Sequence, residues 1–458
     1  MEKLSIKEIR KAVDGKIVQG NPDEEIDNVC IDSRKLKADD MFFAIIGERF
    51  DGHSFLDEAV NKGAKALIVD RSIKAYPKVS IIRVKDTTEA LQNLAHYNRM
   101  RYDNLKIIGV TGSVGKTTTK DMISWVLKQK YNVLKSQGNF NNHYGLPLSL
   151  LSLKGDEDFA VLEMAMSNIG EISRLAEIAR PEIGVVTNVG PAHLKNLDNV
   201  ANVAEAKKEL IEGLPENGLA ILNYDNEYVR KMNTAFKGKE VIYYGLDSSA
   251  DIYANEIFTD EKNKNINFTV NYKNKKMKIT LNKPGRHNIY NALAAIALAR
   301  KLNIEWDIIK ESFTNLNFSS LRLDIKEGKD FNVINDTYNA NPLSMKAAID
   351  VLMDIHQERT IAVLGDMLEL GPQKEEAHFE VGRYLAENGV DILITVGELA
   401  EIIANGAEEI MKKNKIFKVK SNQEAYKLLK ELLNKGDCIL VKGSRKMKME
   451  EIVDMILD

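Results

Sequence analysis

Short apolar runs, each the length of a β-strand, alternate along this chain with segments whose apolar residues recur every three or four positions. Four such runs lie between residues 106 and 222, and three more lie between residues 360 and 441. Runs that are apolar at every position are typical of parallel strands covered on both faces. The intervening segments, such as residues 172–179, are typical of amphipathic helices. The chain is therefore predicted to be an α/β protein built on parallel sheets.

The length of the chain and changes in its pattern of apolar and polar residues predict three domains. The 458 residues correspond to about three domains at ~150 residues each. A small α/β domain is expected over residues 1–103, because the charged stretch at its end lacks apolar periodicity. A central parallel-sheet domain is expected over residues 104–318, with an antiparallel insertion at 251–281, where polar and apolar residues alternate. A Rossmann-like, doubly wound domain is expected over residues 319–458.

Composition narrows the class of protein. The chain has 64 Lys and Arg against 67 Asp and Glu, a net charge of −3, which disfavours a general nucleic-acid binder. Its two cysteines, Cys30 and Cys438, are far apart in the sequence, so we expect no disulfide framework and a reducing compartment. The N-terminus has no apolar signal-peptide core, and no stretch approaches the ~18 apolar residues of a membrane span. A cytoplasmic protein without membrane insertion is expected.

The strongest chemical signal is the segment 111–119, T-G-S-V-G-K-T-T-T, which follows a predicted strand and opens a predicted helix. Gly112 and Gly115 allow backbone N–H groups to turn inward around an anion, and the helix N-terminus adds positive potential. We expect Lys116 to reach the β- and γ-phosphates of a nucleotide and the Thr117 hydroxyl to ligate Mg²⁺. The predicted nucleotide-binding residues of this loop are Thr111, Gly112, Ser113, Val114, Gly115, Lys116, Thr117 and Thr118.

Other interpretations of this loop stay open. Val110 replaces the first glycine of the common P-loop pattern, so a glycine-rich turn without a ligand is the structural alternative. A GTPase would carry Asn-Lys-x-Asp after a strand. The match at residues 434–437 follows a predicted helix instead, and its Gly436 is better explained as a helix stop. The GTPase interpretation is therefore disfavoured.

Polar side chains follow two more predicted strands of the central domain. Glu163 ends one strand, and His193 lies six residues beyond another, after a Gly-Pro turn. Ligands of open parallel sheets gather at the carboxyl ends of the strands, so Glu163 is expected where a Mg²⁺ on Thr117 needs an oxygen ligand. An exposed acid and an ordinary loop histidine are the structural alternatives. Lys207 lies on a predicted amphipathic helix, where lysines are normally solvated, and periodicity does not single it out.

Taken together, several blocks resemble the Mur ligase family of ATP-dependent amino-acid ligases. These blocks are residues 111–119, 163, 188–193, 206–207, 285–292 and 335–337. Further blocks are similar to those of the family members that add D-alanyl-D-alanine to a UDP-linked tripeptide, namely residues 31–34, 47–53, 138–142, 364–371 and 441–449. The loop of this family is similar to T-G-[ST]-x-G-K-[ST]-[ST], so Val110 is no departure from it.

The resemblance implies a division of labour among the three domains. The N-terminal domain would bind the UDP-sugar, the central domain ATP, and the C-terminal domain the incoming dipeptide. The carboxylate of UDP-MurNAc-tripeptide would attack the γ-phosphorus of ATP, and the amino group of D-Ala-D-Ala would then attack the acyl phosphate. The products would be the UDP-MurNAc-pentapeptide, ADP and phosphate. Small-molecule substrates, a monomeric chain and no nucleic-acid partner are expected.

The resemblance also implies ATP and Mg²⁺ as cofactors and assigns catalytic roles. Lys116 would hold the triphosphate, Thr117 and Glu163 the first Mg²⁺, and His193 a second Mg²⁺ near the acyl phosphate. Lys207 corresponds to a lysine that CO₂ carbamylates, which gives an anionic oxygen ligand for Mg²⁺. This overturns its interpretation as a solvated lysine, although the adjacent Lys208 leaves the register open.

Further binding roles are implied in all three domains. The residues implied to contact the rest of the nucleotide are Asn288, Asn291, Arg322 and Asp336, the last two only after the domains close. The residues implied to contact the UDP-sugar are Ser33, Arg34, Arg49, Asp51 and His53. The residues implied to line the peptide channel and the dipeptide side are Asn139, Phe140, Asn141, Asn339, Asn341 and Asp366.

Three alternatives remain at this point. A relative that adds lysine or diaminopimelate, or a folylpolyglutamate synthetase, would share the nucleotide site, but residues 49–53 and 364–371 argue against both. A nucleotide-dependent binding protein without catalysis would share it too. The sequence leaves open whether lysine or diaminopimelate is the third residue of the tripeptide.

Overall fold

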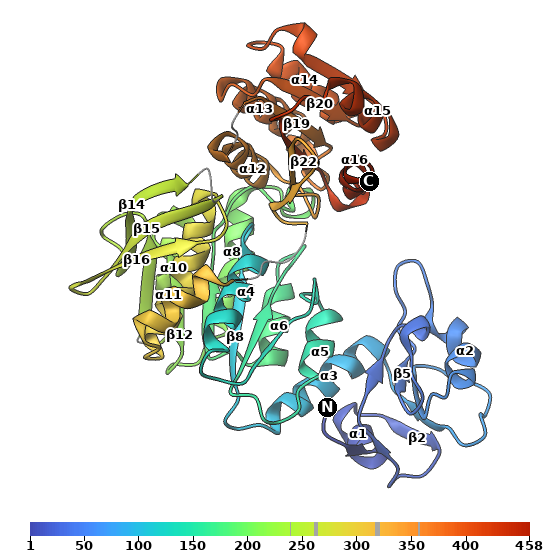
Figure 1. Cartoon of the computed structure of the whole chain (residues 1–458). Helices are drawn as coiled ribbons and strands as arrows, with labels where there is room; N and C mark the ends of the chain where they lie inside the picture. Colours follow the sequence, from blue (N-terminus) through green and yellow to red (C-terminus); the bar gives the residue numbers. More distant parts are fainter. Residues whose placement is uncertain (239, 261–263, 317–320, 356–357) are drawn as a thin grey trace.

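Three larger β-sheets with covering helices, together with a small two-stranded sheet, organise the part of the chain that the structure describes (Figure 1). The computed structural model describes residues 1–238, 240–260, 264–316, 321–355 and 358–458. The predicted class, three α/β domains, is confirmed. The boundary expected at residues 318 and 319 lies outside the described residues. Across the described ranges, we find no helix with the length and apolar character needed to cross a membrane.

The N-terminal domain holds a five-stranded sheet in the order β2-β7-β6-β5-β4, in which only β2 and β7 pair antiparallel. A Ser5–Glu8 capping box starts its first helix. Its strands are β1 (Leu4–Ser5), β2 (Lys16–Gln19), β3 (Glu25–Ile26), β4 (Val29–Cys30), β5 (Met41–Phe43), β6 (Ala66–Val69) and β7 (Ser80–Arg83). Its helices are α1 (Ile6–Ala12), α2 (Leu56–Asn61) and α3 (Thr87–Met100).

The central domain is built on a nine-stranded sheet in the order β16-β15-β14-β13-β12-β11-β8-β10-β9. Its strands are β8 (Lys106–Thr111), β9 (Val133–Lys135), β10 (Phe159–Glu163), β11 (Ile183–Val186), β12 (Leu219–Asn223), β13 (Glu240–Gly245), β14 (Ile252–Asp260), β15 (Asn265–Tyr272) and β16 (Lys275–Leu281). Its helices are α4 (Lys116–Leu127), α5 (Gly145–Leu150), α6 (Glu171–Ala179), α7 (Leu194–Leu197), α8 (Val200–Glu212), α9 (Glu227–Arg230), α10 (Arg286–Lys301) and α11 (Trp306–Thr314). The antiparallel segment expected as an insertion extends this sheet, because β14 pairs parallel with β13.

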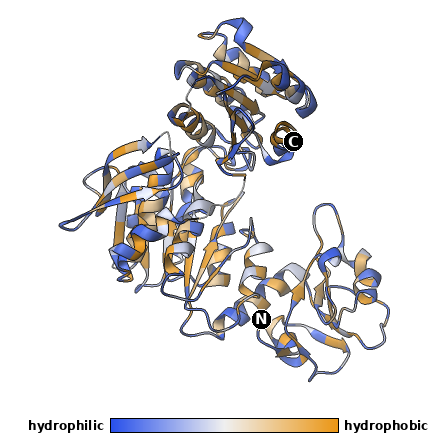
Figure 2. Cartoon of the chain, in the orientation of Figure 1, coloured by the Kyte–Doolittle hydropathy of each residue, from blue (hydrophilic) through white to orange (hydrophobic). Residues whose placement is uncertain are grey.

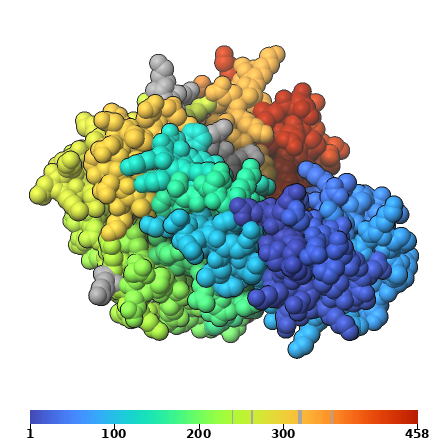
Figure 3. Space-filling view, turned by 90° about the horizontal axis from the view of Figure 1, so that it is seen from below, coloured from blue at the N-terminus to red at the C-terminus, as the bar shows by residue number. Residues whose placement is uncertain are grey.

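Successive side chains of the central parallel strands point to opposite faces of the sheet, and both faces are buried, which explains the runs of apolar residues. On β8, Ile107 packs into a core that includes residues of α3, α5, α6 and α8, whereas Ile108 and Val110 pack with α4 and α10 on the opposite face. Both faces of the sheet are therefore covered, and hydrophobic residues gather on the strands (Figure 2). The first of these cores is shared with the N-terminal domain through Leu91 and Leu94 of α3. Figure 3 shows the two domains in contact.

The C-terminal domain has a six-stranded sheet in the order β17-β18-β22-β19-β20-β21, with helices on both faces. This double cover agrees with the predicted doubly wound layering, although the order of the parallel strands differs from the 3-2-1-4-5-6 order of a Rossmann fold. Its strands are β17 (Asp324–Glu327), β18 (Asn332–Asn335), β19 (Thr360–Gly365), β20 (Ile392–Val396), β21 (Ile416–Val419) and β22 (Cys438–Lys442). Its helices are α12 (Pro342–Ile355), α13 (Lys374–Glu387), α14 (Ala400–Ala407), α15 (Asn422–Leu432) and α16 (Glu450–Leu457).

Candidate active site

The glycine-rich loop singled out in the sequence joins β8 to α4, at the carboxyl end of the central sheet. On one side of β8 lies β10, with Val110 opposite Glu163, and on the other lies β11, with Thr111 opposite Val186. The ends of three parallel strands therefore meet at this loop. Ligands of open α/β sheets bind at such a position.

Two glycines give the loop its shape. Gly112 has a φ of 152°, and a Cβ atom there would lie 1.8 Å from the Thr187 hydroxyl oxygen. Gly115 has a φ of 82° and precedes the first turn of α4. Among the described residues no side chain caps this helix, so its first N–H groups are available to an anion.

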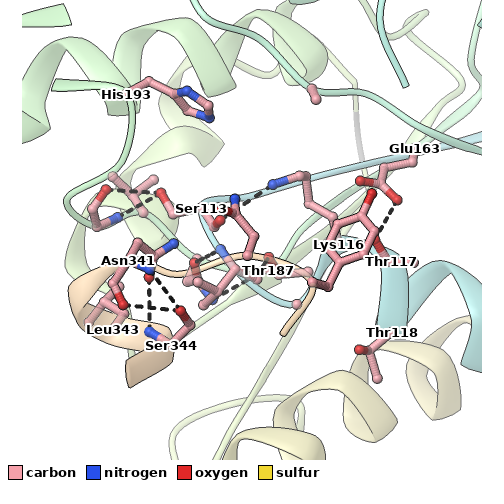
Figure 4. Close-up of a pocket in the computed structure, with 18 of the residues that line it drawn as sticks. Ser113, Lys116, Thr117, Thr118, Glu163, Thr187, His193, Asn341, Leu343 and Ser344 are labelled. Carbon is pink, nitrogen blue, oxygen red and sulfur yellow. Dashed lines mark hydrogen bonds between the residues drawn. The ribbon is translucent and has the colours of Figure 1, made fainter. Parts of the chain in front are cut away.

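Lys116 points back over the loop and donates a 2.7 Å hydrogen bond from Nζ to the Gly112 carbonyl (Figure 4). Burial lowers the pKa of this lysine, and the Glu163 carboxylate partly opposes the shift. An ammonium group held by backbone carbonyls inside a cavity can move to a phosphate when a nucleotide enters. This placement fits the role predicted for Lys116.

Glu163 is buried and joins the loop to the neighbouring strand. Its Oε2 accepts a 2.8 Å hydrogen bond from the Thr117 hydroxyl, and its Oε1 accepts a 2.9 Å bond from Asn141 Nδ2. Hydroxyl and carboxylate oxygens are the donors that Mg²⁺ prefers, so Thr117 and Glu163 fit a shared magnesium site. Within the described part of the chain, no group of three or more His, Cys, Asp or Glu could hold a metal.

His193 lies directly before α7 in a left-handed conformation, with a φ of 56°. Burial is the main cause that lowers the pKa of its imidazole to about 4, and the positive charge of Lys116 adds to the effect. The imidazole is therefore neutral near pH 7, the form that ligates metals. Its Nδ1 lies 3.5 Å from Oε2 of Glu369 in the C-terminal domain.

The structure separates Lys207 from its neighbour Lys208. Lys207 is only 2% exposed on α8, and neither a hydrogen bond nor an ion pair to it is found among the described residues. Burial, followed by the Lys116 charge, lowers the pKa of Lys207 well below its usual value. Lys208 instead pairs with Glu205 and Glu212 on the outer face of the helix. Of the two, Lys207 lies in the environment that favours a neutral amine, the form that adds CO₂.

A buried ion pair organises the C-terminal side of the site. Lys442, at the end of β22, lies 2.5 Å from Oδ2 of Asp336 and donates a 2.8 Å hydrogen bond to the Asn339 carbonyl. Burial lowers the pKa of Lys442, and the Asp336 carboxylate opposes that shift. Oδ1 of Asp336 accepts the backbone N–H of Leu323 at 3.1 Å. Lys442 thereby connects two of the residues predicted from the sequence.

Lys283 links the central and C-terminal domains. Its Nζ donates to the carbonyl of Arg322, and burial is the main cause that lowers its pKa to about 8. The Arg322 guanidinium lies 3.9 Å from the centre of the Tyr338 ring. Arg322 and Asp336 were expected near the nucleotide only after domain closure, yet both already share a cavity with Lys116.

That cavity has a volume of about 1120 Å³, at the upper end of the range for small-molecule sites. It is lined mainly by the central and C-terminal domains, and Glu48 reaches it from the N-terminal domain. The predicted site residues that line it are Ser113, Val114, Gly115, Lys116, Thr117, Thr118, Asn139, Asn141, Glu163, His193, Asn288, Asn291, Arg322, Asp336, Asn339 and Asn341.

Other predicted residues do not line this cavity. They are Thr111, Gly112, Phe140, Lys207 and Asp366, and the N-terminal group of Ser33, Arg34, Arg49, Asp51 and His53. Asp366 accepts the backbone N–H of Ala400 at 2.7 Å, at the start of α14, so in this structure it has a structural contact. In the N-terminal group, Asp51 accepts a 2.7 Å contact from His53, which holds a loop of that domain.

Sequence reasoning missed several lining residues. Lys283, Lys442, Glu369, Leu343 and Ser344 all line the cavity. Lys442 and Glu369 lie within the blocks at 441–449 and 364–371, which were noted only as a resemblance. No sequence pattern marked Lys283, which lies just after β16. Its place in the cavity depends on how this edge of the central sheet meets the C-terminal domain.

The Asn-Lys-x-Asp match is structural. Asp437 is buried and binds Arg359 through two hydrogen bonds, from Nε at 2.9 Å and from Nη2 at 2.7 Å. It lies immediately before β22, at the end of the C-terminal sheet opposite to Lys442. The motif is not part of the cavity lining, as the helix-stop interpretation predicted.

Three family models match the chain in order. The Mur ligase family, catalytic domain, matches residues 25–99, the Mur ligase middle domain matches residues 110–299, and the Mur ligase glutamate ligase domain matches residues 321–445. A UDP-N-acetylmuramoyl-tripeptide--D-alanyl-D-alanine ligase of Bacillus subtilis is 38% identical and covers 100% of this chain and 99% of its own length. The chain belongs to the Mur ligase family.

Solved structures agree with this membership. A MurF crystal structure from Acinetobacter baumannii superposes on this Mur ligase with a TM-score of 0.92 at 31% identity, covering 100% of this chain and 99% of the other. A MurF ligase from Thermotoga maritima, solved in complex with ADP, gives 0.83 at 31% identity over 94% and 96% of the two chains. The Escherichia coli UDP-N-acetylmuramoyl-tripeptide--D-alanyl-D-alanine ligase is 36% identical over 94% of each chain.

Proposed function

We propose that this Mur ligase uses ATP to join D-alanyl-D-alanine to UDP-MurNAc-tripeptide through an acyl-phosphate intermediate. The observation that carries the proposal is the placement of Lys116, Thr117 and Glu163 in one cavity with residues of the C-terminal domain. The chain is also 38% identical over its full length to a UDP-N-acetylmuramoyl-tripeptide--D-alanyl-D-alanine ligase. The relatives that share only the fold are more distant. A diaminopimelate-adding ligase and a folylpolyglutamate synthase match at 18% and 14% identity.

The nucleotide half of the site binds and orients ATP. The free N–H groups at the start of α4 would receive the phosphates, and Lys116 would leave the Gly112 carbonyl for them. Asn288 and Asn291 lie on one face of α10, joined by a 3.3 Å hydrogen bond, and would meet the adenine. Arg322 and Asp336 would approach the nucleotide from the C-terminal domain.

The magnesium ligands proposed are Thr117, Glu163 and His193, with the carbamate of Lys207 as a further oxygen ligand. Bound Mg²⁺ would neutralise charge between the phosphates and the attacking carboxylate. The Thr117 and Glu163 oxygens already face each other at 2.8 Å, which suits a hard cation. Burial favours the neutral form of the Lys207 amine, which is the form that adds CO₂.

The chain's own groups would then bring two substrates together. Asn139, Asn141 and the N-terminal domain would present the tripeptide carboxylate to the γ-phosphorus, with Ser33, Arg34, Arg49, Asp51 and His53 toward the UDP-sugar. Asn339 and Asn341 would hold the dipeptide on the other side. Phosphorylation supplies the leaving group that a carboxylate lacks. We place this reaction in the cytoplasm and expect a monomer.

An isotope experiment tests the proposal. Carboxyl-¹⁸O-labelled UDP-MurNAc-tripeptide, ATP and D-Ala-D-Ala should yield the pentapeptide, ADP and phosphate that carries one ¹⁸O atom. Omission of either peptide substrate should stop phosphate release. Phosphate without label would rule out the acyl-phosphate route, and equal turnover with D-alanine alone would rule out the dipeptide specificity. Lysine and diaminopimelate tripeptides, tested side by side, identify the third residue.

A further inference from the structure

One loop of the C-terminal domain is built to hold a single carboxylate in the cavity. Residues 366–370 follow β19 and reach the short 3₁₀ helix η4 (Gly371–Gln373). Three hydrogen bonds fix this loop to its own domain: from Met367 N–H to His378 Nε2 at 2.9 Å, from Leu368 N–H to Ser444 Oγ at 2.8 Å, and from Ala400 N–H to Asp366 Oδ1 at 2.7 Å. Directly after these anchors, Glu369 has a φ of 68° and lines the cavity.

The same loop meets the central domain. Helix α7 lies beside η4, and a Cβ atom on Gly371 would come within 2.8 Å of the Lys195 Cα atom. This close approach places the Glu369 carboxylate 3.5 Å from the His193 Nδ1 atom. Glu369 therefore belongs to the C-terminal domain but faces the side of the cavity where the acyl phosphate is expected.

The other carboxylates that the central and C-terminal domains contribute to the cavity have hydrogen-bond donors. Glu163 accepts from Thr117 and Asn141, and Asp336 accepts from Lys442 and Leu323. The remaining two are Glu171, which accepts from Ser167 and Asn168, and Asp225, which accepts from Tyr290 and Leu246.

Glu369 differs from all of these. Within the described ranges, it accepts no hydrogen bond and pairs with no lysine or arginine, and its side chain is 59% exposed. Glu48 also has no such partner among the described residues, but it belongs to the N-terminal domain, on the side expected for the UDP-sugar. Glu369 is thus the carboxylate with free acceptor capacity on the dipeptide side.

Charge decides what such a carboxylate can bind. Lys116, Lys283, Arg322 and Lys442 line the same cavity, as a site for polyanions requires. A free carboxylate there repels phosphate groups, so its ligand must be a cation. In the proposed reaction, the cation that must reach the acyl phosphate from the C-terminal side is the α-ammonium group of the incoming dipeptide.

We propose that Glu369 binds the α-ammonium group of the incoming dipeptide and holds its nitrogen beside the acyl phosphate. This inference rests on the proposed function. In the step that follows, the nitrogen gives up one proton and forms a bond to the acyl carbon while the bond from that carbon to the phosphate oxygen breaks. The second proton leaves as the amide forms, so an acyl phosphate and an ammonium group give an amide, HPO₄²⁻ and one proton.

Steady-state kinetics with the full chain test this assignment. Glu369→Gln keeps the size of the side chain and removes its charge, Glu369→Asp keeps the charge, and Glu375→Gln removes a nearby exposed charge outside the cavity. We expect Glu369→Gln to raise the KM for D-Ala-D-Ala at least tenfold and to change the KM for ATP and UDP-MurNAc-tripeptide less than twofold. Glu369→Asp should recover part of the loss, and Glu375→Gln should behave as the wild type.

A partial reaction separates binding of the amine from formation of the acyl phosphate. Hydroxylamine is largely uncharged at pH 7.5 and traps an acyl phosphate as a hydroxamate without the dipeptide. The rate of hydroxamate formation by Glu369→Gln should stay within twofold of the wild-type rate. Equal melting temperatures of the variants would show that all of them fold.

Other outcomes overturn the inference and differ from a failure of the proposed function. An unchanged KM for D-Ala-D-Ala would remove Glu369 from amine binding while the ligase activity stands. A raised KM for the tripeptide alone would assign Glu369 to the side-chain amine of the third residue. A parallel loss of hydroxamate would assign it to the phosphorylation step. If the wild type forms neither pentapeptide nor hydroxamate, the proposed function itself is wrong.

Discussion

The Thr117 hydroxyl donates a 2.8 Å hydrogen bond to Oε2 of Glu163, across the junction between the start of α4 and the end of β10. The second carboxylate oxygen is held by Asn141 at 2.9 Å. The two oxygens proposed as magnesium ligands are therefore fixed toward each other by the register of β8 and β10. These two oxygens would serve as ligands to Mg²⁺, which would neutralise charge on the phosphates.

Replacement of Lys116 tests the phosphate role of the loop. Lys116→Met should lower kcat by about 10²–10³-fold, because a cation that stabilises charge in the transition state is lost. The fold should persist, since the hydrogen bonds of Lys116 within the described residues go to the carbonyls of its own loop. Phosphate release and the melting temperature are the measurements.

The control for this variant is Lys128→Met, which changes an exposed lysine at the other end of α4. It should retain the wild-type rate. If Lys116→Met also retains that rate, the loop does not hold the transferred phosphate.

Lys207 and Lys208 form a matched pair for the carbamate proposal. Lys207→Ala should lower kcat by at least about 100-fold, and formate or acetate should restore part of it by occupying the vacated anion position. Lys208→Ala should have little effect, because it removes surface ion pairs worth at most about 1 kcal/mol. Turnover after removal of bicarbonate and CO₂ gives an independent measurement.

The reverse result would be informative as well. Full activity of Lys207→Ala, or loss of activity in Lys208→Ala alone, would remove the carbamate from Lys207 and reopen the register between the two lysines.

Much of the fold could be predicted, because strands that are buried on both faces of a sheet consist of recognisable runs of apolar residues. Residues such as Ile107 and Ile108 on β8, or Val363 and Leu364 on β19, enter different cores on opposite faces of one sheet, so successive inner positions of those strands are apolar. No comparable sequence pattern indicates the order of the strands within a sheet. The place of β22 between β18 and β19 depends on packing among distant segments, which local patterns do not record.

The site shows the same limit. The loop around Lys116 was predictable because glycine spacing, strand and helix are contiguous in the sequence. Periodicity could not predict Lys207 as a site residue, since the α8 pattern gives no reason why this lysine, and not Lys208, should be buried. Only the family resemblance pointed to it. Asp366 and Glu369 lie in one block, and only the structure separates the residue that contacts α14 from the one that faces the cavity.

Asp437 provides a test against the GTPase interpretation. Asp437→Ala should lower the free energy of unfolding by about 3 kcal/mol, because it removes the two hydrogen bonds that pair the partly buried Arg359 with a carboxylate. The KM for ATP and the preference for ATP over GTP should not change. Lys435→Ala, in the same tetrapeptide but exposed, should alter neither stability nor kinetics. A loss of base preference in either variant would revive guanine recognition by this segment.

His378 makes stability depend on pH through the loop that carries Glu369. The ring is fully buried, its Nε2 accepts from Met367 N–H, and its Nδ1 contacts the Lys374 carbonyl at 2.5 Å. Burial lowers the pKa of His378, whereas a histidine in the unfolded chain titrates at about 6.5. Below that pH the unfolded chain binds a proton that the folded chain does not, so the free energy of unfolding falls as the pH falls.

His378→Gln isolates this contribution. The variant should be less stable than the wild type at pH 7.5, because a buried hydrogen bond is lost, by about 1–3 kcal/mol. Since glutamine does not titrate, the gap in stability between the two proteins should shrink between pH 7.5 and pH 5.5. Urea unfolding at each pH measures the gap. If the gap stays constant or widens as the pH falls, His378 is protonated in the folded protein. Its Nε2 would then carry a hydrogen and would face the Met367 N–H group, so that two donors would meet.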